Sequence, residues 1–353
     1  MSFVNQLEPQ SLLDAFMVSP PDGFRSMASV QGTPAFLARF DLLTTAEPEL
    51  QRRIRSWPGY RWWSRLLRPR TCFIGSTVTE YAWLPASVEP VQLARALTDR
   101  HAREQAFLIV KDLPVDSPLL DQASNTSSAR LSAALEQQGF VLVEGQALAW
   151  VPIDFDNEDA YLARLSRGAR RDIRRKLRVR DGIDIEVLPT GSPAFEDEQT
   201  LARLFDLYQR VFEQSEIHFD RLDADFFRSV FRDGDSGGVV FVYRHDGHML
   251  GWNLCYQHAG NLVDKYVGFE YPQAREHNLY VVSWMHNLDY ARRMGLRNYI
   301  AGWTDPEVKA HLGARFTFTR HAVRPRSRLL RLLLKRLSHH FESDRQWFEE
   351  HAR

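Results

Sequence analysis

The sequence predicts a mixed-sheet α/β protein in which one folding unit occurs twice. Residues 91–153 and residues 280–323 share one order of predicted elements, which is helix, strand, loop, helix, glycine and strand. A run of three β-type segments, separated by short turns, fills residues 239–269. The length of 353 residues is enough for two hydrophobic cores. Antiparallel strands that lead into a helix and then a further strand indicate a mixed sheet.

The first half of the chain supplies the first copy of this unit. Residues 71–84 are rich in β-branched and aromatic side chains, Gly139 follows a helical pattern as its stop, and Glu144-Gly145 is a turn signal between two apolar runs. The predicted elements are helices and turns over 1–70, one or two strands over 71–84, a helix over 91–105, a strand over 106–110, a helix over 128–138 and a hairpin over 140–153.

The second half supplies the other copy. Asp246-Gly247 and Ala259-Gly260 are hairpin turns, and Gly295 and Gly313 end two helical patterns. The predicted elements are strands over 239–244, 249–257 and 261–269, a helix over 280–294, a strand over 298–301, a helix over 307–312, a strand over 316–323 and a basic amphipathic helix over 327–341. We therefore divide the chain into residues 1–153, 154–325 and 326–353.

Composition excludes several classes of protein. The chain has 45 basic and 45 acidic residues and is 44% apolar, so neither a disordered chain nor a globally basic DNA-binding protein is indicated. Cys72 and Cys255 lie far apart without metal-ligand spacing, so we expect no disulfide and no metal site. We expect no signal peptide and no membrane span, and hence a cytoplasmic protein. The motifs of nucleotide-binding loops, zinc peptidases, serine hydrolases and dinucleotide oxidoreductases are missing from the sequence.

Four stretches carry a resemblance to a known family: residues 160–188, with an arginine-rich helix entering a strand; 204–227, with a helix pair; 237–271, with the hairpins; and 277–316, with a helix and a closing Lys-x-x-x-Gly segment. Together they resemble the GNAT acyltransferase superfamily, in particular its two-copy, Fem-like branch. The match covers roughly residues 154–325 and, more faintly, the first half. The resemblance implies two tandem GNAT-like units, of which the C-terminal one is catalytic and the N-terminal one degenerate.

The resemblance implies transfer of an acyl group, foremost acetyl, from acyl-CoA to the amine of a small molecule or peptide. One departure concerns the donor. Members of this superfamily carry a glycine-rich turn before the cofactor helix, whereas residues 271–278 contain no glycine. The donor could therefore also be an aminoacyl-tRNA or a carrier protein. A further alternative is that the protein is not an enzyme and binds an acidic partner. The coiled-coil arm of the peptidoglycan aminoacyltransferases has no evident counterpart.

Three residues are candidates for acid–base chemistry. Glu270 ends the strand that would face the donor, and its alternative is a solvated turn residue. His277 lies at the start of the cofactor helix, where it could act as a base or contact phosphate, or have no chemical role. Asp305 follows a strand end, and its alternative is to cap the helix that begins at Pro306.

Further candidates would bind donor or substrate. Phe269, Arg275, Asn278 and Lys309 are assigned to the donor, because they lie at the end of the donor-facing strand, at the start of the cofactor helix and in the Lys-x-x-x-Gly segment. The candidates for substrate binding are Lys265, Trp303 and Arg171. Lys265 follows Asp264 within an apolar strand, so one of these two charges needs a buried partner.

Two basic stretches interrupt the neutral average. Residues 161–180 hold nine basic side chains and one acid, and residues 308–341 hold nine and none. A solvated helix face is the ordinary explanation, and the alternatives are contacts with phosphates, an acidic carrier protein, tRNA or anionic lipid. We expect the helix over 327–341 to pack on its own domain through Leu330, Leu333, Leu334, Leu337 and Phe341. Peripheral contact with a membrane is the alternative.

Overall fold

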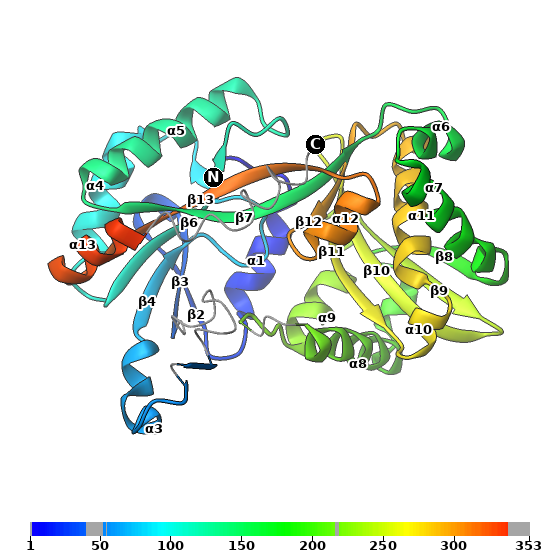
Figure 1. Ribbon diagram of the computed structural model, residues 1–353, viewed down its shortest axis with the longest axis horizontal. Coiled ribbons are helices and arrows are strands. Elements are labelled where there is room, and N and C mark those ends of the chain that lie inside the picture. The colour runs from blue at the N-terminus through cyan, green and yellow to red at the C-terminus, as the bar shows by residue number, and fades with distance from the viewer. Residues whose placement is uncertain (1, 40–51, 54, 216–218, 338–353) are drawn as a thin grey trace.

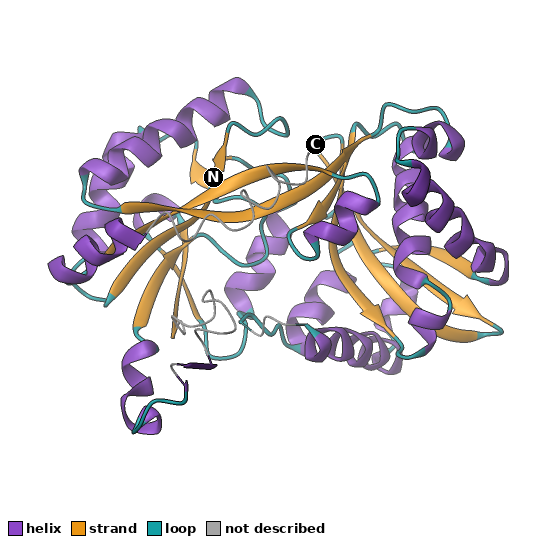
Figure 2. Cartoon of the chain, viewed as in Figure 1, coloured by secondary structure: helices purple, strands orange, loops and turns teal. Residues whose placement is uncertain are grey.

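The computed structural model describes residues 2–39, 52–53, 55–215 and 219–337, and they fold around one large mixed sheet (Figure 1). Eleven strands follow the order β2-β3-β4-β6-β13-β7-β12-β11-β10-β9-β8, and β1 pairs with β5 separately. Helices cover the sheet at both ends of the molecule (Figure 2). The predicted mixed-sheet α/β class is confirmed.

The N-terminal unit comprises the described residues up to 153. Its elements are β1 (Phe3–Val4), α1 (Gln10–Val18), β2 (Arg25–Ala28), β3 (Pro34–Arg39), α3 (Tyr60–Trp63), β4 (Arg70–Ile74), β5 (Leu84–Pro85), α4 (Pro90–His101), β6 (Phe107–Val115), α5 (Gln122–Gln137) and β7 (Val141–Pro152). Local signals explain both ends of α5. Asp121 caps α5 by accepting a hydrogen bond from the Ser124 backbone at 2.7 Å, and Gly139 follows α5 with a φ of 82°.

The C-terminal unit spans residues 154–325 and is followed by one helix. Its elements are α6 (Glu158–Ala163), α7 (Arg167–Lys176), β8 (Asp184–Pro189), α8 (Glu198–Gln214), α9 (Ala224–Arg232), β9 (Gly238–His245), β10 (His248–His258), β11 (Asn261–Phe269), α10 (Gln273–Glu276), α11 (Leu279–Arg293), β12 (Asn298–Gly302), α12 (Pro306–His311) and β13 (Arg315–Pro325), with α13 (Arg328–Leu337) after them. The predicted antiparallel strands are β9, β10 and β11, in the expected order.

The two copies exchange their last strands. In the first copy α4, β6 and α5 lead into β7, and in the second α11, β12 and α12 lead into β13. β7 pairs with β12 of the C-terminal unit, β13 pairs with β6 of the N-terminal unit, and β7 and β13 pair with each other. Each unit's final strand therefore extends the other unit's sheet, and one sheet joins both units.

A hydrophobic core also crosses between the units. Phe16 and Phe36 of the N-terminal unit belong to the same buried cluster as Phe227 and Trp252 of the C-terminal unit. Phe227 and Trp252 meet edge to face with ring centroids 6.0 Å apart, a favourable geometry for aromatic rings. The contact between the units is thus apolar as well as hydrogen-bonded.

The predicted hairpin over residues 140–153 is wrong, because β7 runs unbroken through Glu144-Gly145. Gly145 instead lies where β13 approaches closely, and a Cβ at this position would lie 2.3 Å from Thr319 Oγ1. The pairing of β7 with β13 shifts between Phe318 and Arg320, so the glycine accompanies a bulge rather than a turn.

The packing predicted for the last helix is only partly found. Leu334 packs against the core, whereas Leu330 is 47% exposed. The side chains of Leu333 and Leu337, and the whole of Phe341, lie outside what the structure describes.

Candidate functional site

Two central strands of the C-terminal unit separate and leave a fork in the sheet. β11 and β12 are parallel and pair only from Asn261 opposite Asn298 to Val263 opposite Ile300. β11 continues to Phe269, and its residues 264–267 are half-buried although the strand lies inside the sheet. Beyond the fork, no strand of the described residues pairs with β11 on its β12 side. Backbone groups on that edge therefore have no strand partner in the described part of the chain, and the Tyr266 carbonyl accepts a hydrogen bond from Asn253 Nδ2 at 3.3 Å.

A bulge accompanies the fork. On the other side of β11, Tyr266 pairs with Leu254 and Asp264 pairs with Cys255, so Lys265 is the extra residue. A bulge bends its strand and re-aims the side chains around it. It thereby places Asp264 and Lys265 in different surroundings.

Asp264 lies at the branch point of the fork in a buried polar network. Its Oδ1 accepts a hydrogen bond from Asn253 Nδ2 at 2.6 Å, and its Oδ2 accepts one from the Tyr299 hydroxyl at 2.7 Å. Burial raises the pKa of Asp264, and these hydrogen bonds oppose the rise. Asn287 on α11 donates a further hydrogen bond to the Asn253 side chain at 2.7 Å. The network joins β10, β11, β12 and α11.

Lys309 faces the same branch point from α12. Its side chain is buried, and Nζ donates a hydrogen bond to the Ala301 carbonyl at 2.6 Å. Burial lowers the pKa of Lys309 to about 8, while the negative charges of Asp264, Glu80 and Asp305 act in the opposite direction. A lysine with this pKa exchanges its proton near neutral pH.

Glu270 follows β11 and has arginine partners. Its two carboxylate oxygens accept hydrogen bonds from Arg203 and Arg210, both on α8. These ion pairs hold α8 against the end of β11. The role of Glu270 as a base stays a prediction, and in this structure both of its oxygens are engaged.

The segment predicted to hold the donor's phosphates forms its own short helix, α10. The backbone N–H groups of residues 274–278 all donate to carbonyl groups of residues 270–275, over 2.7–3.2 Å. These N–H groups are therefore not presented to an anion, unlike those of a glycine-rich turn. Asn278 adopts a left-handed φ of 49° before α11.

Arg275 and His277 of this segment remain accessible. Arg275 donates to the Gln214 side chain at 2.6 Å, and its guanidinium lies 4.9 Å from the centroid of the Tyr271 ring. His277 Nδ1 lies 3.0 Å from the Gln273 carbonyl, and its ring is 4.4 Å from that of His245. Phe269, by contrast, is buried in the core beside α11.

Asp305 and Trp303 lie in the loop after β12. Asp305 is exposed, has a φ of 54°, and precedes α12 without a side-chain capping bond. Its charge acts on Tyr271, Tyr280 and Lys309, which places it near the start of α11. Trp303 meets Tyr81 of the N-terminal unit edge to face at 6.4 Å, so it contributes to the contact between the units.

Lys265 has partners within the protein. Its buried Nζ lies 2.6 Å from Glu80 Oε1 and 3.4 Å from Glu8 Oε1, both in the N-terminal unit. The pKa of Lys265 is raised, because the two carboxylates outweigh the effect of its burial. Desolvation raises the pKa of Glu8 to about 7. These three residues form the Glu8–Lys265–Glu80 cluster, which supplies the buried partner that the sequence required.

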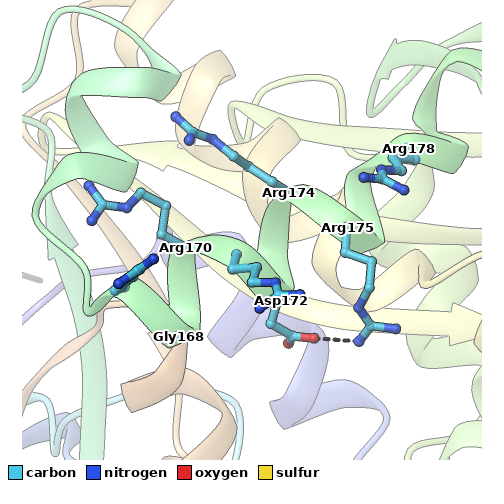
Figure 3. Close-up of a pocket in the computed structure, with 8 residues that line it drawn as sticks. Gly168, Arg170, Asp172, Arg174, Arg175 and Arg178 are labelled. Atoms are coloured by element: carbon cyan, nitrogen blue, oxygen red, sulfur yellow. Dashed lines mark hydrogen bonds and ion pairs between the residues drawn. The ribbon is translucent and has the colours of Figure 1, made fainter.

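Arg171 lies apart from the fork, on the exposed face of α7. This face lines a surface hollow together with the neighbouring arginines (Figure 3). Arg174 and Arg175 pair with Asp159 and Asp172. Among the described residues no ion-pair partner is found for Arg167, Arg170, Arg171 and Arg178.

The structure thus brings Asp305 and Lys309 toward the branch point. Glu270, Arg275 and His277 lie together around α10. Arg171 lies on a separate surface. Sequence reasoning singled out Asp264 and Lys265 but missed Glu8 and Glu80 as the partners of Lys265. Lys265 and Glu80 are 185 positions apart, so no local pattern could connect them. The position of Lys265 beside Asp264 within an apolar strand was the signal that drew attention to it.

The described His, Cys, Asp and Glu side chains nowhere gather in threes as metal ligands would. Within the described ranges, no helix has the length and apolar character needed to cross a bilayer.

Comparisons with known proteins agree with this geometry. No curated protein matches the chain. Among the solved structures that share its fold are the following three. FemX is 13% identical with a TM-score of 0.55 and covers 94% of each chain. The C-terminal domain of a putative lysylphosphatidylglycerol synthetase from Agrobacterium fabrum is 14% identical with a TM-score of 0.54, over 92% of this chain and 94% of that one. L-PGS from Bacillus licheniformis is 11% identical with a TM-score of 0.51, over 94% and 97%.

At these identities the similarity concerns the fold. A family model, described as the acetyltransferase (GNAT) domain, matches residues 167–310, which include the fork, α11 and Lys309. The C-terminal unit of this chain belongs to the GNAT superfamily.

Proposed function

We propose that this protein is an N-acyltransferase whose C-terminal unit moves an acyl group, foremost acetyl, from acyl-CoA to an amine. The observation that carries the proposal is the open fork between β11 and β12. The amide groups of a pantetheine arm can pair with the edge of β11 that faces away from β10 over residues 264–269, in the way a further strand would. The acyl group would then lie near the branch point, beside Asp264 and Lys309.

The reaction needs a proton acceptor. The amine nitrogen forms a bond to the carbonyl carbon of the thioester, the carbon–sulfur bond breaks, and the amine loses a proton. Lys309 is suited to exchange that proton because its pKa is about 8. His277, Asp305 and Glu270 are the other candidate bases. A Lys309→Ala or His277→Ala variant that folds normally is expected to lose activity, and full turnover by both would remove these assignments.

An aminoacyl-tRNA is the second candidate donor, and α10 is the observation that favours it. Because the N–H groups of residues 274–278 are used within the chain, the pyrophosphate of coenzyme A has no backbone cradle there and would depend on side chains such as Arg275. The unpaired arginines of α7 offer positive charge to a polyanion. The chain shares its fold with FemX and L-PGS, and the Fem-like branch that its sequence resembles includes aminoacyl-tRNA-dependent transferases.

Ligand-induced stabilisation separates the two donors. The protein is heated with acetyl-CoA, with longer acyl-CoAs, or with charged tRNA, and the midpoint of unfolding is compared with that of the free protein. We expect millimolar acetyl-CoA to raise the midpoint, and Arg275→Ala to reduce the rise while Arg95→Ala, an exposed site on α4, leaves it unchanged. Stabilisation by charged tRNA alone would replace acyl-CoA with the second donor. No effect of any acyl donor would refute both.

A further inference from the structure

One end of the molecule carries two basic segments that the proposed chemistry does not use. Residues 52–70 contain seven arginines and three tryptophans, and residues 324–337 contain six basic side chains; neither segment contains an acid. The protein as a whole has equal numbers of acidic and basic residues. Both segments therefore depart strongly from the average charge of the chain.

The two segments lie at the same end of the long axis. α3 and α13 both project from the outer side of the N-terminal unit, and the helices of the C-terminal unit lie at the opposite end (Figure 1). We call these two separate projections, residues 55–70 and α13, the outer end. It is remote from the fork between β11 and β12.

Large apolar side chains project from the outer end. Trp62 is 88% exposed, and on α13 Leu329 is 79% and Leu332 is 64% exposed. They belong to a small set of exposed large apolar residues among the described ones. Exposed tryptophan and leucine interleaved with arginine indicate a binding surface rather than a solvated face.

The orientation of α13 is fixed by its opposite face. Leu334 packs against the hydrophobic core, and Arg331 donates a hydrogen bond to the Pro325 carbonyl at 3.2 Å. Packing on the protein therefore does not require Leu329 and Leu332, which face outward between Arg328 and Arg336. Apolar residues on the free face of an anchored helix are therefore available to another partner.

We propose that the outer end binds the surface of an anionic phospholipid bilayer. Leucine side chains of a helix that lies in the membrane plane enter the interface, tryptophan prefers that depth, and arginine is attracted to anionic headgroups. An acidic protein could contact the same side chains, and failure to bind anionic vesicles would favour that partner over the membrane. The proposal does not depend on acyl transfer, because it concerns a different surface.

The test is sedimentation of the full chain with vesicles of phosphatidylcholine alone or with a third of phosphatidylglycerol. We expect binding to the anionic vesicles and its weakening by salt. The double variant Leu329→Ser, Leu332→Ser should bind at least about tenfold more weakly. The variant Arg328→Gln, Arg336→Gln should lose about tenfold, and Trp62→Ser should also weaken binding.

Matched controls lie at the opposite end. Arg167→Gln, Arg171→Gln on α7 removes two exposed arginines, and Val187→Ser on β8 removes an exposed apolar side chain. Both should bind vesicles as the wild type does. The proposal is overturned if the wild type ignores anionic vesicles, if it binds neutral ones equally well, or if the outer-end variants keep full binding. If the α7 variant loses vesicle binding instead, membrane contact belongs to the basic surface of α7, and the proposal is equally overturned.

Discussion

Lys309 offers a quantitative test of the polar branch point. The variant Lys309→Met keeps an unbranched side chain of similar length and removes the charge. In the folded protein burial lowers the pKa of Lys309 from 10.5 to about 8. Between these two pH values the unfolded chain holds a proton that the folded chain has released, so the stability contributed by this residue rises with pH. Burying the charged lysine costs roughly 3 kcal/mol at pH 7 and under about 1 kcal/mol at pH 10.

The assay is urea unfolding of both proteins at pH 7 and pH 10. Other titrating groups contribute equally to wild type and variant, and so does any pH-independent cost of losing the hydrogen bond to Ala301. The free energy of unfolding of the wild type, relative to that of the variant, should therefore rise by about 2.5 kcal/mol between the two pH values. Lys335→Met, at an exposed position on α13, is the control and should show no such change. An unchanged difference for Lys309→Met would refute the reasoning.

Three other predictions concern stability. Lys265→Met should lower the free energy of unfolding at pH 7 by about 3–5 kcal/mol, because it leaves Glu8 and Glu80 as unpaired buried acids; a variant as stable as the wild type in urea would contradict this. Glu8→Gln should gain stability relative to the wild type between pH 5 and pH 8. The pKa of Glu8 is raised to about 7 in the folded protein, so below that pH the folded wild type keeps a proton that the unfolded chain has released, and its stability falls as the pH rises. Equal differences in melting temperature between variant and wild type at pH 5 and pH 8 would exclude this. Gly313→Ala should cost more than Gly247→Ala in thermal unfolding, since both have a positive φ but only at Gly313 would a Cβ lie 2.5 Å from a leucine methyl group; similar losses would show that the contact is relieved.

Local sequence patterns were sufficient for most of the elements, but not for residues 1–70. This segment was predicted as helices and turns, whereas it also contains β1, β2 and β3, of which β2 and β3 extend the main sheet. The two copies of the unit and the three antiparallel strands depend on short-range periodicity and on glycine stops, and these signals hold wherever the elements pack. The turn predicted at Glu144-Gly145 was wrong because glycine is favoured both in a turn and where two strands approach closely. Only the position of Thr319 on β13, far along the chain, distinguishes the two cases.

The polar clusters were less predictable than the elements. The sequence showed that Asp264 and Lys265 occupy successive positions of an apolar strand, and that one of them needs a partner. It did not show the bulge at Lys265, because that depends on the register with β10. The partners Glu8 and Glu80 come from the N-terminal unit, so they follow from the contact between the units. The catalytic and binding roles of the remaining candidates stay predictions.

The choice of cation in the interior is itself informative. The chain has 45 basic residues and only five of them are lysines, yet Lys111, Lys265 and Lys309 all interact with buried or largely buried acids between or near the two units. Arginine keeps its proton at every accessible pH, whereas lysine responds to its surroundings. The two carboxylates around Lys265 keep it charged, but Lys309 has no ion-pair partner within 4 Å among the described residues and its pKa falls to about 8. Lys265 is therefore suited to hold the units together, and Lys309 to exchange a proton at the fork.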